Sequence, residues 1–157
     1  MKKKFIGLLF AGIMLSGFKS SGQVAKYYDN SGNELGYSQV DGGVGKYFDN
    51  SGNELGYDQM DAGVLKIFDN SGNELGYEQK DGAVVKIFDN SASELGYVES
   101  DGEVLKVFNN SATELGYIQA DGDVLKIFDN SGSELGYTQK GHSFPALQYF
   151  FFFFSKH

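Results

Sequence analysis

Apolar and polar residues alternate along this chain in a pattern that repeats every twenty residues. Six near-identical blocks fill residues 24–143, and the third block reads VLKIFDNSGNELGYEQKDGA. Within that block, two short segments rich in β-branched and aromatic residues, 64–68 and 74–79, flank the turn-forming run 69–73. This pattern predicts one β-hairpin per block, and Asp81-Gly82 predicts a second turn into the next block. Because no block shows a helical period, we expect twelve short strands.

The turns decide which side chains share a face, because a one-residue slip moves every side chain of a strand to the other side. A three-residue loop over 70–72, with its glycine in the left-handed conformation, pairs Ile67 with Leu75 and Leu65 with Tyr77. These four residues then form one apolar face.

The same loop type at 80–82 pairs Tyr77 with Val85 and carries the apolar face into the next block. A two-residue Asp-Gly turn puts Tyr77 opposite Lys86 and breaks that continuity. We therefore expect three-residue loops at both turns, with a steric cost where Ala92 and Ala112 replace the turn glycine.

Closure of the sheet removes exposed strand edges, so the fold class that we expect is all-β. Six hairpins would close into a short, shallow antiparallel β-barrel, preceded by an N-terminal hydrophobic signal helix. Eight strands make a barrel that its own side chains fill and sixteen leave a water channel, so twelve lie between the two. The apolar face would line a central channel. Its expected lining is Leu65, Ile67, Leu75, Tyr77, Val85, Ile87, Leu95, Tyr97, Leu105, Leu115, Tyr117, Leu125, Ile127, Leu135 and Tyr137.

The opposite face is mixed and carries one lysine and one glutamate from every block. Lys66 would lie across from Gly76, with Glu74 and Glu78 diagonal to it and within reach of its long side chain. We expect a charged belt that contributes to solubility and register rather than a binding site.

The chain outside the repeats predicts export and an aromatic tail. Residues 1–22 have the form of a secretory signal, with three lysines before an apolar run of eleven residues, which is short for a membrane-spanning helix. Cleavage would start the mature protein at Gln23, with no transmembrane span, in a secreted, periplasmic or cell-envelope location; the alternative is an uncleaved anchor. Residues 23–143 form the repeat domain, and 144–157 form the tail.

The tail contains six consecutive aromatic residues, 149–154. If exposed, such a run is prone to β-aggregation. One interpretation is that it plugs the apolar centre of the barrel. The alternatives are a disordered tail or, if a homopolymeric tract shifted the reading frame, a segment that is not native.

Charge and residue usage exclude several function classes. From residue 23 onward nine lysines face 21 acidic residues and there is no arginine, which argues against nucleic acid as a partner. The chain has no cysteine, and its two histidines lie in the tail. Because six copies of each carboxylate suit a structural or multivalent role, we expect no enzyme, no catalytic residue and no cofactor. The run 69–74 has the wrong spacing for an EF-hand calcium loop, so we expect no metal either.

The repeated Asp-Asn-Ser-Gly and Glu-Leu-Gly-Tyr segments, as in KIFDNSGNELGYEQKDG, resemble the repeats of β-flower proteins. These are short symmetric barrels that are often exported or lipid-anchored and are similar in shape to tubby-like barrels, whose centre holds a hydrophobic helix. The chain departs from the anchored members because it has no lipobox cysteine. The resemblance implies an apolar channel and transfers no catalytic residue.

Three function hypotheses remain open at this stage, and the partner is unknown. The first is an exported, non-enzymatic module that binds an apolar or lipid-like ligand in its channel. The second is an envelope or adhesion module that makes multivalent contacts, including contacts to glycans if the tyrosines are exposed. The third is a purely structural array.

Overall fold

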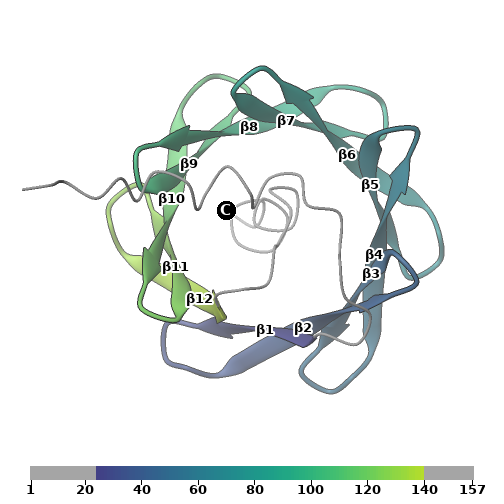
Figure 1. Ribbon diagram of the computed structural model, residues 1–157, viewed down its shortest axis with the longest axis horizontal. Helices are drawn as coiled ribbons and strands as arrows, with labels where there is room; N and C mark the ends of the chain where they lie inside the picture. The colour runs from purple at the N-terminus through teal and green to yellow at the C-terminus, as the bar shows by residue number, and fades with distance from the viewer. Residues whose placement is uncertain (1–23, 140–157) are drawn as a thin grey trace, which may run out of the picture.

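The computed structural model describes residues 24–139, which form a single closed antiparallel barrel of twelve strands (Figure 1). Each strand pairs with its sequence neighbours, and β1 pairs with β12 to close the ring. The strands are β1 (Val24–Asp29), β2 (Glu34–Asp41), β3 (Val44–Asp49), β4 (Glu54–Asp61), β5 (Val64–Asp69), β6 (Glu74–Asp81), β7 (Val84–Asp89), β8 (Glu94–Asp101), β9 (Val104–Asn109), β10 (Glu114–Asp121), β11 (Val124–Asp129) and β12 (Glu134–Gln139). The all-β, six-hairpin barrel expected from the sequence is thus confirmed.

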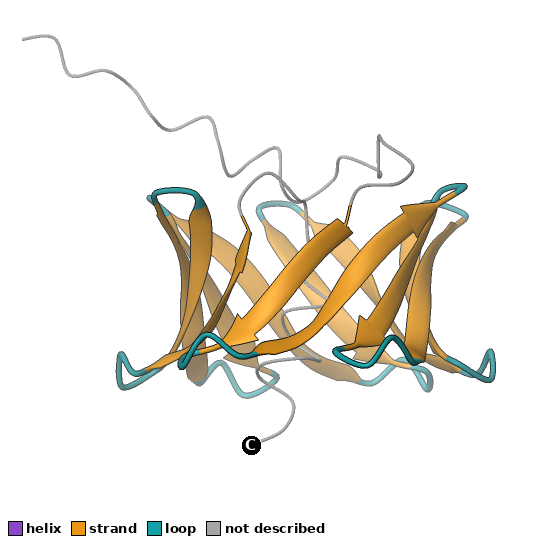
Figure 2. Cartoon of the chain, turned by 90° about the horizontal axis from the view of Figure 1, so that it is seen from below, coloured by secondary structure: helices purple, strands orange, loops and turns teal. Residues whose placement is uncertain are grey.

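The strands are tilted and the barrel is wider than it is tall (Figure 2). The loop within each hairpin lies at one rim, and the loop between successive hairpins lies at the other. The expected signal segment and aromatic tail fall outside the described residues.

The loop within each hairpin is the three-residue loop that the sequence predicts. In the third repeat the Asp69 N–H donates to the Asn73 carbonyl and the Gly72 N–H to the Asp69 carbonyl, at 2.9 and 3.1 Å, and Gly72 has φ +83°. Ala92 and Ala112 adopt the same left-handed conformation, with φ of 63° and 59°. Their side chains therefore bear the expected steric strain.

A β-bulge follows this loop and overturns the predicted pairing. Phe68 pairs with Glu74, but Ile67 then pairs with Gly76 and Leu65 with Glu78 rather than with Leu75 and Tyr77. The same shift occurs in all six hairpins. Because a bulge inserts one extra residue into a strand, every residue beyond it changes face.

The glycine after the bulge is required by close packing of the next strand. A Cβ built on Gly56 would overlap the carbonyl oxygen of Phe68 in β5, and one on Gly76 would overlap that of Phe88 in β7. A glycine inside a strand is a recognised mark of a bulge or of such a close approach.

The loop between hairpins has two residues, so the second predicted three-residue loop is wrong. Asp81 pairs with Val84, which leaves Gly82 and Ala83 as the loop, one residue later than the Asp-Gly alternative. The first loop residue has positive φ in every copy, including Ala62 at 50°. Two-residue hairpin loops favour such conformations because they match the twist of the strands.

Candidate functional site

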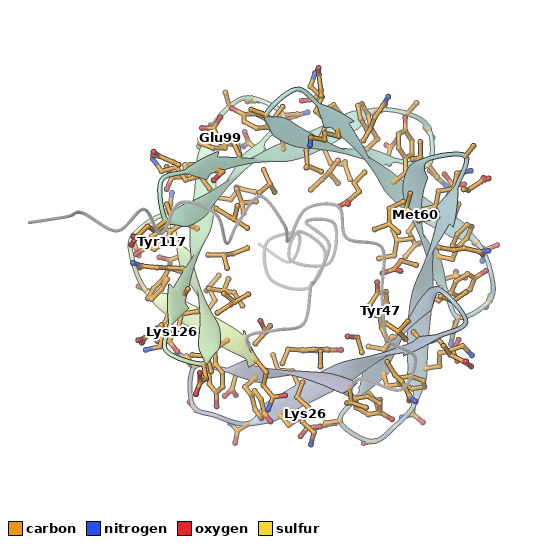
Figure 3. The ribbon with its side chains drawn as sticks, in the orientation of Figure 1. Lys26, Tyr47, Met60, Glu99, Tyr117 and Lys126 are labelled. Atoms are coloured by element: carbon orange, nitrogen blue, oxygen red, sulfur yellow. The ribbon has the colours of Figure 1, made fainter. Side chains whose placement is uncertain are left out.

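The inner wall of the barrel is built from alternate residues of every strand. In the third repeat these are Leu65 and Ile67 of β5 and, beyond the bulge, Gly76, Glu78 and Lys80 of β6, as the cross-strand pairs require. Tyr47, at the position of Ile67, points inward in Figure 3, whereas Lys26 and Lys126 point outward. We define the inner wall by these five positions of each repeat.

Apart from Ser100 of β8, the inner wall is apolar over the strands β7 to β11. Val98 of β8 and Ile118 of β10 have exposed fractions of 0% and 1%, and they pack among aliphatic side chains of the neighbouring strands. We call this part the apolar half; its buried members are Val85, Ile87, Val98, Leu105, Val107, Ile118, Leu125 and Ile127. It presents only hydrocarbon in this buried set and can therefore hold apolar groups without leaving polar atoms unpaired.

The equivalent positions of the first three repeats hold most of the polar groups of the wall, and we call them the polar half. Besides the recurring glycine, their polar or small members are Ala25, Tyr27, Ser38, Gly45, Tyr47, Asp58, Glu78 and Lys80, and their larger apolar members are Val40, Met60, Leu65 and Ile67. The block position that holds Val98 and Ile118 in the apolar half holds Ser38, Asp58 and Glu78 here. One barrel thus has two chemically different inner surfaces.

Tyr27 occupies space that a glycine leaves free. Its hydroxyl donates to the Phe48 carbonyl at 2.9 Å, and a Cβ on Gly36 would come within 2.5 Å of that hydroxyl oxygen. Burial, and next the charge of Asp49, raise the pKa of Tyr27 far above its ordinary value. Its hydroxyl therefore remains protonated and acts as a donor at any physiological pH.

Asp58 also lies over a glycine. It pairs with Gly45 across β3 and β4, and a Cβ on Gly45 would lie 2.7 Å from the Asp58 Oδ1 atom. Asp58 has an exposed fraction of 0%. The second block, with Gly45, is the only one that has no side chain at this position. The missing side chain leaves the space that the buried Asp58 carboxyl group occupies.

The extra residue of each bulge is a leucine, Leu75 in the third repeat, and we call these six residues the bulge leucines. Their exposure differs between the two halves. Leu35, Leu55 and Leu75 have exposed fractions of 44%, 45% and 42%. Leu95, Leu115 and Leu135 are partly buried and pack against the hydrophobic core. The same residue at the same block position is therefore largely exposed beside the polar half and packed beside the apolar half.

The outer face is nearly identical in all six repeats and holds the tyrosines. Tyr77 pairs with Lys66 on one side and stacks on Phe88 on the other, with ring centroids 4.9 Å apart. Five further stacked pairs have the same geometry; the sixth joins Tyr137 to Tyr28 across the closure. The expectation that the tyrosines share a face with the inner aliphatic residues is wrong, because the bulge shifts them outward.

The predicted charged belt is present on the outer face with one changed partner. The Lys66 ammonium lies 3.2 Å from a Glu74 oxygen and 3.0 Å from an Asp61 oxygen. Hydrogen bonds to Asp61 and then Glu74 raise the pKa of Lys66. Glu78, expected as the second partner, lies on the inner wall instead. These pairs are partly exposed to solvent, so each contributes little to stability.

The turn aspartates act as local caps. The Asp69 carboxylate accepts hydrogen bonds from the Asn73 side chain at 2.8 Å and from the backbone N–H groups of Ser71 and Asn73. These bonds, the Asn73 side chain first, lower the pKa of Asp69. The turn carboxylates are thus used by their own backbone.

The structure separates the fifteen expected lining residues into three groups. The aliphatic residues of the odd-numbered strands lie buried on the inner wall, the leucines lie at the bulge, and the tyrosines lie outside. Sequence reasoning missed Ser38, Asp58, Glu78, Val98, Ile118 and Thr138 on the inner wall. Variation at this one block position among otherwise near-identical repeats was the signal for them. That the wall lines a ligand channel stays a prediction.

Within residues 24–139, no three His, Cys, Asp or Glu side chains are grouped so that they could hold a metal ion. The same part of the chain contains no helix long and apolar enough to cross a membrane.

No protein-family model matches the sequence, and the comparison with curated proteins finds no match. The class that the described residues define is a closed antiparallel repeat β-barrel.

Proposed function

We propose that this protein is a non-catalytic, exported barrel of the β-flower type that holds one elongated amphiphilic molecule against its inner wall. The observation that carries the proposal is a contrast between the two faces. The lysine, glutamate and tyrosine of the outer face recur in all six repeats, whereas the inner positions other than the glycine after the bulge differ from repeat to repeat.

This contrast argues against a guest with sixfold symmetry. A symmetric guest, or an interior needed only to fill space, would place the same demand on every repeat. Here one block position reads Ser38, Asp58, Glu78, Val98, Ile118 and Thr138 in chain order. Its polar members lie together around the ring, in the first three repeats and, across the closure between β12 and β1, at Thr138. The interior therefore favours a single guest that has a polar side and an apolar side.

The chemistry of the two halves indicates the class of guest. The apolar half suits a hydrocarbon chain, since burial of apolar surface is the main favourable term in such binding. The polar half combines the carboxyl groups of Asp58 and Glu78 with the Tyr27 hydroxyl and the single ammonium group of Lys80, so carboxyl groups outnumber cations there. It suits a head group that donates hydrogen bonds or carries positive charge. We therefore propose an amine-bearing or hydroxylated lipid rather than an anionic one.

The proposal is tested by extracting the purified full chain with organic solvent and identifying the released molecules by mass spectrometry. Binding of a dansyl-labelled alkylamine is then measured by fluorescence, with a dansyl-labelled fatty acid of the same length as the comparison. We expect the alkylamine to bind at least tenfold more tightly. The variant Ile118→Ser should weaken binding, and the neighbouring outer-face variant Gln119→Ser should not. No extracted lipid and no binding of either probe would exclude this function.

A second candidate function is supported by the position of the tyrosines. Six partly exposed tyrosine rings at equivalent outer sites suit repeated contacts to a glycan of the cell envelope. This candidate predicts that the full chain sediments with isolated envelopes. Replacement of Tyr57, Tyr77 and Tyr97 by leucine should weaken that association stepwise, whereas Ile118→Ser should leave it unchanged.

A further inference from the structure

We propose that two copies of this chain exchange their first two repeats, residues 24–61, through the loop Ala62-Gly63 and so form a domain-swapped dimer. Each barrel of this dimer holds β1 to β4 of one copy and β5 to β12 of the other. The partner is a second copy of the same chain, and no guest inside the barrel is involved.

The ring can open without a break in its chain, because its first and last strands meet at one of the twelve strand contacts. β1 pairs with β12, whereas the other neighbours are joined by loops of two or three residues. When the pairing of β4 with β5 is also lost, β1 to β4 stay attached only through Ala62-Gly63. Two copies that have opened in this way rebuild every strand contact between them, since each closed barrel again contains twelve strands in the same order.

The loop Ala62-Gly63 has the least favourable backbone of the five loops between hairpins. Its two residues have φ of 50° and 87°, and two-residue loops with positive φ at both positions favour glycine, asparagine or aspartate. The other four loops place glycine at the first position, where all five have positive φ. Alanine in the left-handed region bears a steric cost that glycine does not. Because an extended hinge removes this cost, exchange is favoured at Ala62 over the other four loops.

The strands beside this loop are in register for one continuous ribbon. Asp61 pairs with Val64, the residues that flank the loop. When the loop is extended, the same register places Ala62 of one copy opposite Gly63 of the other. The ladder between β4 and β5 then continues through the hinge, and two residue pairs that the monomer lacks are added. Alanine also suits the ribbon better than a second glycine, because glycine loses more conformational freedom in a strand.

Ala92 has a similar left-handed backbone, with φ of 63°, but a side chain stabilises the closed form of its loop. The Asp89 carboxylate accepts hydrogen bonds from the backbone N–H groups of Ser91 and Ser93, each at 2.8 Å. Opening of this loop would break both bonds and divide a hairpin between two copies. Ala92 is therefore a matched control, because its replacement by glycine relieves the same kind of strain away from the hinge.

The native chain and two glycine variants test the hinge. The full chain is refolded at low and at high concentration, and its mass in solution is measured by size-exclusion chromatography with light scattering. We expect a dimer whose dissociation constant rises at least tenfold in Ala62→Gly, because glycine relieves the strain of the closed loop in both copies. Ala92→Gly should leave the dissociation constant unchanged. A native chain that is monomeric at every concentration, or equal effects of the two substitutions, would overturn the proposal.

Introduced cysteines identify which copy supplies each strand, because the native chain has none. Gln59 and Lys66 lie directly opposite each other across β4 and β5, and Gln79 and Lys86 occupy the equivalent places across β6 and β7. The Cα atoms of such pairs are about 5.5 Å apart, which a disulfide can bridge. We expect the first pair, changed to cysteine, to link two chains in the dimer fraction. The second pair should link residues of one chain, and a non-reducing gel distinguishes the two results.

The position of the alanine should decide the position of the exchange. In the double variant Ala62→Gly with Gly82→Ala, the interchain disulfide should move from the first cysteine pair to the second. A disulfide within one chain for both pairs would mean that the native dimer forms without exchange, and this result would overturn the proposal. An interchain disulfide that stays at the first pair in the double variant would show that the strain at Ala62 does not select the hinge.

Discussion

The half of the barrel built by residues 24–83 and the half built by residues 84–139 share one outer face and differ on the inner one. Outside, both halves repeat the stacked aromatic pairs and the lysine ion pairs. Inside, Ser38 and Asp58 of the first half stand where Val98 and Ile118 stand in the second. In this repeat barrel the outer-face aromatic residues that stack one hairpin on the next recur, while the inner positions differ from repeat to repeat.

The largest expected effect comes from exchanging the character of the two halves at one block position. Val98→Asp places a carboxyl group among fully buried aliphatic side chains and should lower the free energy of unfolding by about 3–5 kcal/mol. Ser38→Asp, in the polar half, should cost about 1 kcal/mol. Urea denaturation followed by circular dichroism measures both. Equal losses would show that the two halves are energetically alike.

Substitution of the glycine that follows the bulge should lower the free energy of unfolding equally in both halves. Gly56→Ala would force a methyl group against the Phe68 carbonyl and should cost about 3 kcal/mol or more. Gly116→Ala, at the equivalent bulge, should cost the same within about 1 kcal/mol, since the register shift is the same. A large difference in thermal midpoint between the two variants would mean that the halves differ in backbone as well as in side chains.

The bulge leucines offer a smaller, matched comparison. Leu115→Ala removes a side chain that packs on the core and should cost about 1–2 kcal/mol. Leu75→Ala removes a side chain that is 42% exposed and should cost less than about 0.5 kcal/mol. Both are read from urea midpoints in the same buffer. The reverse order would contradict the different packing of the two halves.

The smallest expected effect is a pH dependence that the turns of the first half contribute. The Asn33 side chain, followed by backbone N–H groups, lowers the pKa of Asp29, and Asn53 and Asn73 do the same for Asp49 and Asp69. A carboxyl group with a lowered pKa stabilises the fold above its unfolded pKa of about 3.9, and this stabilisation is lost as the pH falls through the folded value.

The triple variant Asp29→Asn, Asp49→Asn and Asp69→Asn should therefore lose less thermal stability than the native chain between pH 6 and pH 3. Asn109 occupies the same place in the fifth repeat and its side-chain oxygen still accepts the Ser111 and Thr113 N–H groups, so the turn itself should survive the change. If the triple variant loses as much thermal stability between pH 6 and pH 3 as the native chain, other carboxyl groups cause the loss of stability in acid.

The sequence predicted the number of strands, the closure and the loop at 70–72, because these depend on local turn chemistry and on a strict period. It did not predict the face of Tyr77, because one bulge residue reverses the parity of everything after it. Gly76 and its copies inside a strand were the available signal. The polar half was missed for a different reason: averaging the repeats into one pattern hid the positions at which they differ.

The closure between β1 and β12 has a consequence for how the ring is made. The other eleven contacts join strands that are adjacent in sequence, and they can form as each hairpin folds. The twelfth joins Tyr27 to Thr138 across the length of the domain and is the shortest ladder, with three paired residues. The wall is thus complete only when β12 has paired with β1. A molecule that lies inside the barrel is surrounded by strands on all sides only after this last pairing has formed.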